Sequence, residues 1–543
     1  MNVRNLLARW FSIRPAGWLV PITLVGAALR LFRLGAQSLW LDESLSVVFA
    51  SVPLKTSMEA IVTDGVHPPL YYLVLRLFLY MGQSESMARL PSAVFGILSI
   101  PLIYEIGRLC FDRKVGLISA FFLSLSPFHI WFSQEARMYA MATFLTLASV
   151  CFFLRLLRQS DGRDTSHTLH PAGQARNWRW WMGFVVCTAL GYYTHYFTFF
   201  ITLAEFVYFL ITFRTHYNLF RKWTLAQAVA FLPLTPWLVA VFTRQMISFG
   251  IGWVPHPEWL DPFKTLWNLS VGYTGSFTPE VMLLLLPFVL AFLYGVWVKA
   301  PSLKVLHPRL LLHLWFWLPM LVVFLLSLRR PIYIDRLFIM TLPAYLILLA
   351  WGIASLNRPQ LSCGVEALAG KFRLKAPLQV LPCGLLSLKT SWVRWSLGVG
   401  LVIAMAAGLS RMYFDASLYT REDWRSAARH VQSHSQPCDI IVLRHFQDLI
   451  PFDYYYQGEV QRAFITLNMV TTPLQELAEG HCRLWMVYRH PHQSSHFLAR
   501  SQPFDLDSQE GDPQVKGWLT DHRDDILEEK GFSGVQVILY VLR

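Results

Sequence analysis

The feature that most constrains this chain is its series of long apolar segments, which short charged connections separate. About eleven of these segments approach the length of roughly 20 residues that a helix needs to cross a bilayer. Hydrophobic residues make up 54% of the 543 residues and charged residues only 15%, and the mean hydropathy is +0.39. This composition is typical of a polytopic α-helical membrane protein, not of several water-soluble domains. The predicted spans are approximately 18–34, 89–109, 116–132, 137–157, 180–195, 197–213, 224–243, 280–298, 310–328, 336–355 and 395–411.

The positive charge of the chain sets its predicted topology. A net charge of +13 might suggest nucleic acid, but the cations cluster in the loops between apolar segments. Loop cations favour the cytoplasmic side, so we exclude nucleic acid as a partner. The segment 70–81 is apolar but short and contains Arg76. If it does not span, the cationic loops, including Arg113 and Lys114, all fall inside; we therefore predict a cytoplasmic N-terminus and an external C-terminus.

The chain divides into two predicted domains. Residues 1–411 form a transmembrane domain with a large first external loop at 35–88, and residues 412–543 form an external domain without a spanning segment. In that second part, strand patterns at 439–443, 483–488 and 535–542 alternate with helix patterns at 422–432 and 521–530. We therefore predict a small external α/β domain. Cys438 and Cys482 each precede a strand. They could pair in an oxidising compartment, but nothing in the spacing requires it, and we expect two free buried thiols.

Polar residues collect at one predicted membrane face. Asp42 and Glu43 directly follow the first span, and a turn of a few residues fixes Glu135 between the third and fourth spans. Charge at this depth is usually retained for chemistry or for a partner. Taken singly, each residue could be an interfacial anchor or a snorkelling side chain. The candidate site residues at this face are Asp42, Glu43, His67, Glu135, Arg137, Tyr139, Arg330, Tyr333 and Arg336.

Taken together, these carboxylates and guanidiniums suit a phosphorylated substrate embedded in lipid. Moving a sugar from a lipid phosphate to a hydroxyl requires a base that takes the proton of the acceptor, and a carboxylate can supply it. Negative charge builds on the departing phosphate, and arginine stabilises it through bidentate contacts.

Several motifs in order resemble the GT-C superfamily of membrane glycosyltransferases, above all the bacterial protein O-mannosyltransferase and aminoarabinose-transferase group. The motifs are Trp40-Leu41-Asp42-Glu43, His67-Pro68-Pro69-Leu70-Tyr71-Tyr72, Arg89-Leu90-Pro91-Ser92, Gln134-Glu135-Ala136-Arg137-Met138-Tyr139 and Arg330-Pro331-Ile332-Tyr333 with Arg336 and Pro343. The likeness covers about residues 16–355 and implies a multi-pass protein of the plasma (inner) membrane with a periplasmic C-terminal domain.

The resemblance also implies a reaction, which is inverting transfer of a sugar from a polyprenyl-phosphate donor. The acceptor would be a hydroxyl of a glycolipid, a glycan or a protein. Asp42 would be the base, Glu43 and Glu135 supporting acidic residues, and Tyr333 with an arginine would contact the phosphate. Relatives often carry Asp where this chain has Glu135, which puts the role of that residue in doubt.

Metal and alternative functions remain open at this point. A divalent metal near His67 or His256 lacks a clear set of partners, so no metal ligand and no cofactor is assigned. The alternative function is a transporter or flippase for a lipid-linked anion. It would be expected to show repeat symmetry and charges near the middle of its spans, and the sequence shows neither. A scaffold for the external domain would leave Asp42 and Glu135 unexplained.

Overall fold

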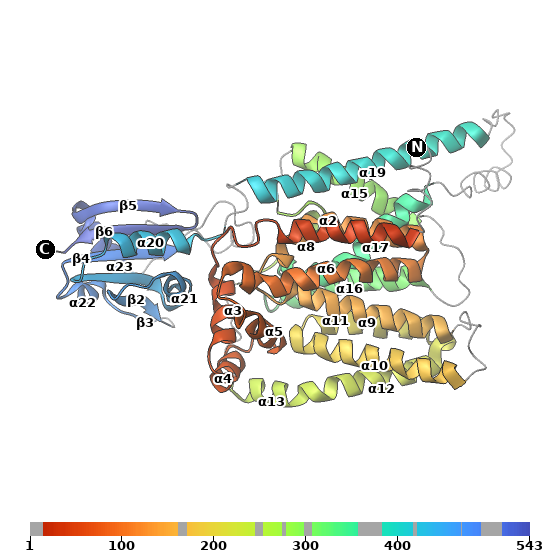
Figure 1. Ribbon diagram of the computed structural model, residues 1–543, viewed down its shortest axis with the longest axis horizontal. Helices are drawn as coiled ribbons and strands as arrows, with labels where there is room; N and C mark the ends of the chain where they lie inside the picture. Colours follow the sequence, from red (N-terminus) through yellow and green to blue (C-terminus); the bar gives the residue numbers. More distant parts are fainter. Residues whose placement is uncertain are drawn as a thin grey trace, which may run out of the picture.

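The structure of the chain is a computed structural model, and it describes nine stretches. These are residues 15–160, 171–244, 254–273, 279–297, 307–356, 383–415, 421–467, 470–489 and 513–542. Most of the chain up to Phe414 is a bundle of apolar helices, and the remainder is a smaller α/β unit at one end of it (Figure 1).

Within the described residues, five helical segments are long and apolar enough to cross a membrane. They are α6 (Glu85–Cys110), α9 (Tyr139–Ser160), the run Phe213–Arg244 that contains α12 and α13, α16 (Pro308–Ser327) and the part Trp392–Phe414 of α19. A sixth arises if α7 (Arg113–Leu125) and α8 (Pro127–Ser133), bent by 60°, count as one. Pro127 causes this break, because proline lacks the N–H that would continue the helix. The chain is thus a multi-pass helical membrane protein, while the predicted total of about eleven spans stays a prediction.

The other helices complete the bundle and its connections. Among the apolar ones are α2 (Leu19–Leu31), α11 (Thr198–Ile211), α15 (Pro279–Trp297) and α17 (Leu342–Ser355), and α17 is buried along its whole length. The remaining described helices of this part are α10 (Pro171–Thr194), α12 (Phe213–Phe231), α13 (Thr235–Arg244), α14 (Asp261–Val271), α19 (Cys383–Phe414) and the short 3-10 helices η1 (Pro15–Trp18), η2 (Leu232–Leu234) and η3 (Asp335–Met340).

The first long loop folds into three short helices at the end of the bundle that faces the α/β unit (Figure 1). These are α3 (Leu41–Ser51), α4 (Leu54–Asp64) and α5 (Leu70–Leu79). Gly65 ends α4 in the left-handed conformation with φ 60°, which glycine adopts without a steric penalty. At 1.5 Å per residue, α5 is about 15 Å long, half the thickness of a hydrocarbon core. Its length agrees with the prediction that this segment does not span.

The C-terminal unit is a six-stranded mixed sheet of order β3-β2-β1-β4-β6-β5. Its strands are β1 (Asp439–His445), β2 (Gln461–Leu467), β3 (Val470–Thr471), β4 (Arg483–Arg489), β5 (Ile526–Phe532) and β6 (Val535–Val541). The central strand β1 pairs in parallel with β2 and β4, and the other pairs are antiparallel. Helices α20 (Trp424–His434) and α21 (Phe446–Tyr455) cover one face, and α22 (Leu474–Ala478) and α23 (Pro513–Asp521) cover the other. Alternate residues of β1 and β4 point to opposite faces of the sheet and belong to the two hydrophobic cores there.

Two expectations about this unit were wrong. The segment 521–530 is not a helix: α23 ends at Asp521, and Ile526–Phe532 is the edge strand β5. The charged residues Glu528, Glu529 and Lys530 suggested an exposed helix. Charged residues also suit an exposed edge strand, and β5 is such a strand because it pairs only with β6. Cys438 and Cys482 are not free thiols but form a disulfide. Strand register explains the pairing, because Asp439 lies opposite Arg483, so the two preceding cysteines are neighbours.

The α/β unit contacts α3 and the start of α6 directly. The hydroxyl of Ser38 donates to the carbonyl of Glu422 at 2.9 Å, and the Leu39 amide donates to the Tyr455 hydroxyl at 2.7 Å. Arg425 of α20 forms an ion pair with Glu85 at 2.6 Å. Polar contacts therefore fix this unit against the end of the bundle where the candidate site residues lie.

Candidate active site

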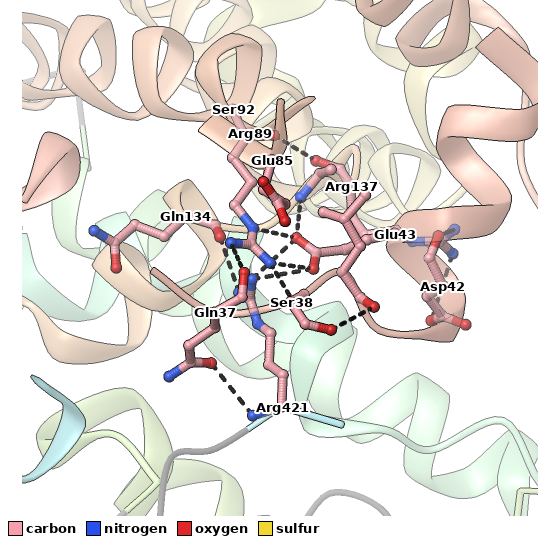
Figure 2. A network of polar contacts seen from close by, with 12 residues as sticks. Gln37, Ser38, Asp42, Glu43, Glu85, Arg89, Ser92, Gln134, Arg137 and Arg421 are labelled. Carbon is pink, nitrogen blue, oxygen red and sulfur yellow. Dashed lines mark hydrogen bonds and ion pairs between the residues drawn. The ribbon is translucent and has the colours of Figure 1, made fainter. Parts of the chain in front are cut away.

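Asp42 and Glu43 lie in the first turn of α3, where the positive end of the helix dipole favours carboxylates. Consecutive residues on a helix point about 100° apart, so the two side chains reach different surroundings. Figure 2 shows Glu43 beside Arg89 and Arg421, and Asp42 turned away from these two arginines. The two carboxylates thus define two separate clusters.

Glu43 is the centre of a fully buried ion network. Arg89 donates to it through two bonds, Nε to Oε1 at 2.8 Å and Nη2 to Oε2 at 2.7 Å (Figure 2). Nη1 of Arg421 lies 3.0 and 3.1 Å from the two oxygens, and the Ala136 amide donates to Oε1 at 2.8 Å. Burial disfavours the carboxylate, but Arg421 and Arg89 outweigh it and lower the pKa of Glu43. We call these residues the Glu43 cluster.

The two arginines of the Glu43 cluster also fasten backbone segments together. Arg89 donates at 2.9 Å to the carbonyls of Leu34, Gln37 and Ser38, which fixes the loop before α3. Arg421, which directly precedes the α/β unit, donates to the Gln134 carbonyl at 2.9 Å. Through these two arginines, Glu43 therefore connects the loop before α3, the turn after α8 and the C-terminal unit.

Asp42 has a different environment. Its side chain is 24% exposed, and Arg336 Nη1 lies 3.1 Å and Arg137 Nη2 3.8 Å from its Oδ2. Both contacts use Oδ2, and Oδ1 has no hydrogen bond or ion pair with the residues that the structure describes. One oxygen of Asp42 is therefore available to a substrate. We call Asp42, Arg137 and Arg336 the Asp42 cluster.

The turn that joins α8 and α9 places Arg137 and Glu135. The Arg137 carbonyl accepts from Ser92 Oγ at 2.9 Å, and Arg137 Nη1 donates to the Asp42 carbonyl at 3.2 Å. Glu135 is 2% exposed, and its Oε1 has no hydrogen-bond partner among the described residues. Burial raises the pKa of Glu135 to about 7, although Arg421 acts in the opposite direction. Glu135 lies between the two clusters and forms no ion pair with the residues that the structure describes.

Arg336, at the start of η3, is held by polar and aromatic neighbours. Its guanidinium carbon lies 5.9 Å from the centroid of the Tyr139 ring, a cation–π distance. The preceding residue, Asp335, accepts from Asn268 Nδ2 at 2.6 Å and from the Arg336 amide at 2.8 Å. Burial raises the pKa of Asp335 to about 6. These contacts orient η3 so that Arg336 reaches Asp42.

The other predicted site residues lie around this centre with different contacts. His67 is 8% exposed and faces His195, with ring centroids 5.4 Å apart. Burial and the nearby Arg137 hold the pKa of His67 well below its usual value, so the imidazole is neutral. The Tyr333 hydroxyl shares a hydrogen bond with Thr265 at 3.0 Å, and Arg330 is exposed. The described residues include no group of three or more His, Cys, Asp or Glu residues placed to hold a metal ion.

Sequence reasoning missed several residues of the site. Arg89 belonged to a quoted motif but received no role, although an arginine at the start of a span after two external acids was a usable signal. Asn268 acts through its contact with Asp335, which lies 67 residues away in the sequence. Arg421 lies 378 residues from Glu43, and no spacing in the sequence relates them.

Comparison with known proteins identifies a matching family model and solved structures with the same fold. Residues 66–239 match the family model described as dolichyl-phosphate-mannose-protein mannosyltransferase. The crystal structure of ArnT from Cupriavidus metallidurans in the apo state is 14% identical, with 96% of this chain and 98% of that chain covered and a TM-score of 0.57. The chain therefore shares the fold of ArnT over nearly its whole length.

Two further solved structures share this fold. ArnT from Cupriavidus metallidurans bound to undecaprenyl phosphate is 14% identical over 96% of this chain and 98% of that chain, with a TM-score of 0.55. The archaeal oligosaccharyltransferase AglB from Archaeoglobus fulgidus, in complex with an inhibitory peptide and a dolichol-phosphate, is 13% identical. That match covers 88% of this chain and 69% of that one, with a TM-score of 0.52. No curated protein is a significant match to the sequence.

Proposed function

We propose that this chain is an inverting glycosyltransferase of the GT-C superfamily, which moves a sugar from a polyprenyl-phosphate donor to a hydroxyl group. The observation that carries the proposal is Asp42, a partly exposed carboxylate with a free oxygen beside two arginines. Two structures of the same fold hold lipid phosphates, undecaprenyl phosphate in ArnT and dolichol-phosphate in AglB. The acceptor is a hydroxyl of a glycolipid, a glycan or a protein.

The Asp42 cluster supplies the parts of such a transfer. Oδ1 of Asp42 takes the proton of the acceptor hydroxyl as the oxygen forms its bond to the anomeric carbon. The bond from that carbon to the phosphate oxygen breaks, and its electron pair stays on the phosphate. Arg336, 3.1 Å from Asp42, is close enough to bind this phosphate and stabilise its growing charge. Attack opposite the leaving group inverts the anomeric centre.

The residues around this cluster have supporting roles in the proposal. The Glu43 cluster holds α3 and the turn after α8 in place, so Glu43 orients Asp42 without reacting. Tyr139 packs against Arg336 and keeps its guanidinium towards Asp42. His67 is neutral and contributes a polar wall, while Glu135 adjusts the charge between the clusters. Tyr333 positions the segment before η3 through Thr265, and Arg330 remains a candidate for outer contacts with the donor.

We also propose that the site faces the outside of the plasma (inner) membrane, with the N-terminus cytoplasmic and the C-terminal unit external. Loop cations support this orientation, because Arg113 and Lys114 then lie inside. A single cysteine introduced at Lys114 should resist membrane-impermeant reagents in intact cells and react after permeabilisation. Labelling of that cysteine in intact cells would mean that each loop lies on the opposite side of the membrane from the one proposed.

The test of the function is a transfer assay with the purified full chain in lipid nanodiscs. A panel of polyprenyl-phosphate sugars is offered with glycolipid, glycan and peptide acceptors, and the products are measured by mass spectrometry. We expect a product with at least one donor and release of the free lipid phosphate. Asp42→Asn is the matched negative control. Movement of the donor across proteoliposomes without any transfer would overturn the proposal in favour of a transporter.

A further inference from the structure

A cavity lies on the other side of the Glu43 cluster from Asp42. Its volume is about 40 Å³. It lies where the ends of α2, α8 and α19 meet, and its wall includes backbone and side chains of the loop before α3. The residues that the argument uses are Arg33, Arg89, Trp131, Tyr413 and Arg421. We call it the Arg33 cavity.

The wall of the Arg33 cavity carries an excess of positive charge. It includes three guanidiniums, from Arg33, Arg89 and Arg421, while Glu43 binds only the last two. Arg89 uses its donors on Glu43 and on backbone carbonyls, so it contributes charge alone. Arg89 and Arg421 together carry one positive charge more than Glu43. Because both arginines are buried, water screens this excess less than it would at the surface, and it attracts an anion more strongly.

Donors for an anion are also present at the Arg33 cavity. Arg421 is 7% exposed, and its Nε has no hydrogen-bond partner among the described residues although it is buried. A buried N–H without an acceptor is costly, so a bound anion that accepts from Arg421 Nε would be stabilised. Arg33 is exposed at the mouth, where Nη1 donates to the Tyr413 carbonyl at 2.9 Å and leaves other N–H groups for a ligand.

The backbone of Arg33 is held in an uncommon conformation. Its φ of 55° is the only positive value among the described residues other than glycine. An L-residue adopts the left-handed region rarely, and glycine would fit there at no steric cost. The long cationic side chain is thus presented at the cavity mouth at the expense of local strain.

The surroundings of the cavity mouth point to a lipid as the carrier of the anion. Leu31 and Phe32 are each 47% exposed at the end of α2, and Phe414 is 70% exposed at the end of α19. The Phe32 ring packs edge-on against Tyr413 at 5.2 Å, which joins the two helix ends. Exposed apolar side chains beside arginine at the end of a span match the boundary between acyl chains and headgroups.

We propose that the Arg33 cavity binds the phosphate group of an anionic membrane lipid whose acyl chains lie along α2 and α19. Arg33 and the free N–H of Arg421 contact the phosphate oxygens. Bound lipid would strengthen the junction between the bundle and the C-terminal unit, because Arg421 belongs to the connection between them. The site is separate from the Asp42 cluster, so the proposal does not depend on the transfer reaction.

The test measures lipid binding by the full chain in detergent, with native mass spectrometry as the readout. The probes are palmitoyl-oleoyl phosphatidylglycerol, the zwitterionic phosphatidylcholine with the same chains, and inorganic phosphate. We expect tight retention of phosphatidylglycerol, and about a tenfold to hundredfold loss of affinity in Arg33→Gly, which removes the guanidinium but suits the positive φ. Arg33→Gln, which keeps a donor for the Tyr413 carbonyl, should show the same loss.

The matched control is Arg329→Ala, which removes an exposed arginine at the outer end of α16. It should leave the retained phosphatidylglycerol unchanged. An equal loss in Arg329→Ala, or retention of phosphatidylcholine as tight as that of phosphatidylglycerol, would overturn the proposal in favour of general lipid adhesion. Displacement of the lipid by millimolar inorganic phosphate would overturn the assignment to a lipid. Unchanged binding in both Arg33 variants would remove the site altogether.

Discussion

Asp42 and Glu43 are consecutive residues on one helix, yet the protein surrounds them in opposite ways. Glu43 is fully buried, and two guanidiniums and a backbone amide use both of its oxygens. Asp42 is 24% exposed, and both of its arginines approach the same oxygen. A carboxylate with every lone pair engaged is a fixed part of the framework, whereas one with a free oxygen can take a proton. Within a single helical turn, Glu43 therefore has the environment of a structural residue and Asp42 that of a reactive one.

The largest effect should come from Asp42→Asn, which tests the reactive side of the comparison. Asparagine keeps the size and most hydrogen bonds, but its amide cannot accept the proton of the acceptor. General-base contributions are typically about 10²–10⁴-fold, so we expect transfer to fall by about that factor with normal folding and donor binding. Turnover is measured on purified, folded protein. Near-normal turnover would show that another group is the base.

Glu43→Gln tests the structural side. The substitution leaves Arg89 and Arg421 buried with no counter-charge, and breaking a buried ion network typically costs about 3–5 kcal/mol. We expect a large loss in the free energy of unfolding but a smaller loss of turnover per folded molecule than in Asp42→Asn. Glu59→Gln, an exposed neighbour on α4, is the matched control and should change neither quantity. If folded Glu43→Gln is the less active of the two variants, the roles must be exchanged.

The same contrast marks how far the sequence predicts the molecule. Apolar length and loop charge predicted a helical membrane protein, because burial in lipid leaves few other solutions for the backbone. Buried strands of the C-terminal unit were recognisable for a similar reason, as in the apolar β1 and β6. The edge strand β5 was not, since its exposed charged residues obey no core pattern.

The candidate site was predictable as a set of residues but not as two clusters. Asp42, Arg137 and Arg336 all come from segments that the sequence assigned to one face, and the structure brings both arginines within 3.8 Å of the Asp42 carboxylate. What the sequence lacked was the division of arginines between the carboxylates. Arg89 and Arg421 reach Glu43 through tertiary packing over 46 and 378 residues, and no local pattern encodes such contacts.

Glu135, between the clusters, should make stability depend on pH. Burial raises its pKa in the folded protein from the usual 4.5 to about 7. Between these values the folded state binds more protons than the unfolded state, so the stability from this group falls as pH rises from 4.5 to about 7 and is level above that. The full change is of the order of 3 kcal/mol.

Glu135→Gln should therefore flatten the dependence of unfolding on pH across this window, as measured by denaturation at pH values on either side of it. Asp335→Asn serves as the comparison, because burial raises the pKa of Asp335 only to about 6 and its contribution should level off at lower pH. An unchanged slope in Glu135→Gln would mean that its carboxyl is ionised and paired in the folded protein, so that it belongs to one of the two clusters.

The smallest expected effect is that of replacing Arg336, which tests whether the arginine nearest to Asp42 binds substrate. If it binds the donor phosphate, Arg336→Ala removes charge-assisted hydrogen bonds worth about 1.5–3 kcal/mol, or about tenfold to a hundredfold in donor affinity. Arg330→Ala, an exposed arginine from the same segment, is the matched control and should weaken binding less. Affinity is measured by titration with a non-hydrolysable polyprenyl-phosphate sugar analogue, and folding by thermal unfolding. Arg336 also neutralises Asp42. A variant that binds donor normally but unfolds at a lower temperature would therefore show that the Asp42 cluster is a structural ion pair like that of Glu43. The two carboxylates would then differ only in their exposure to solvent.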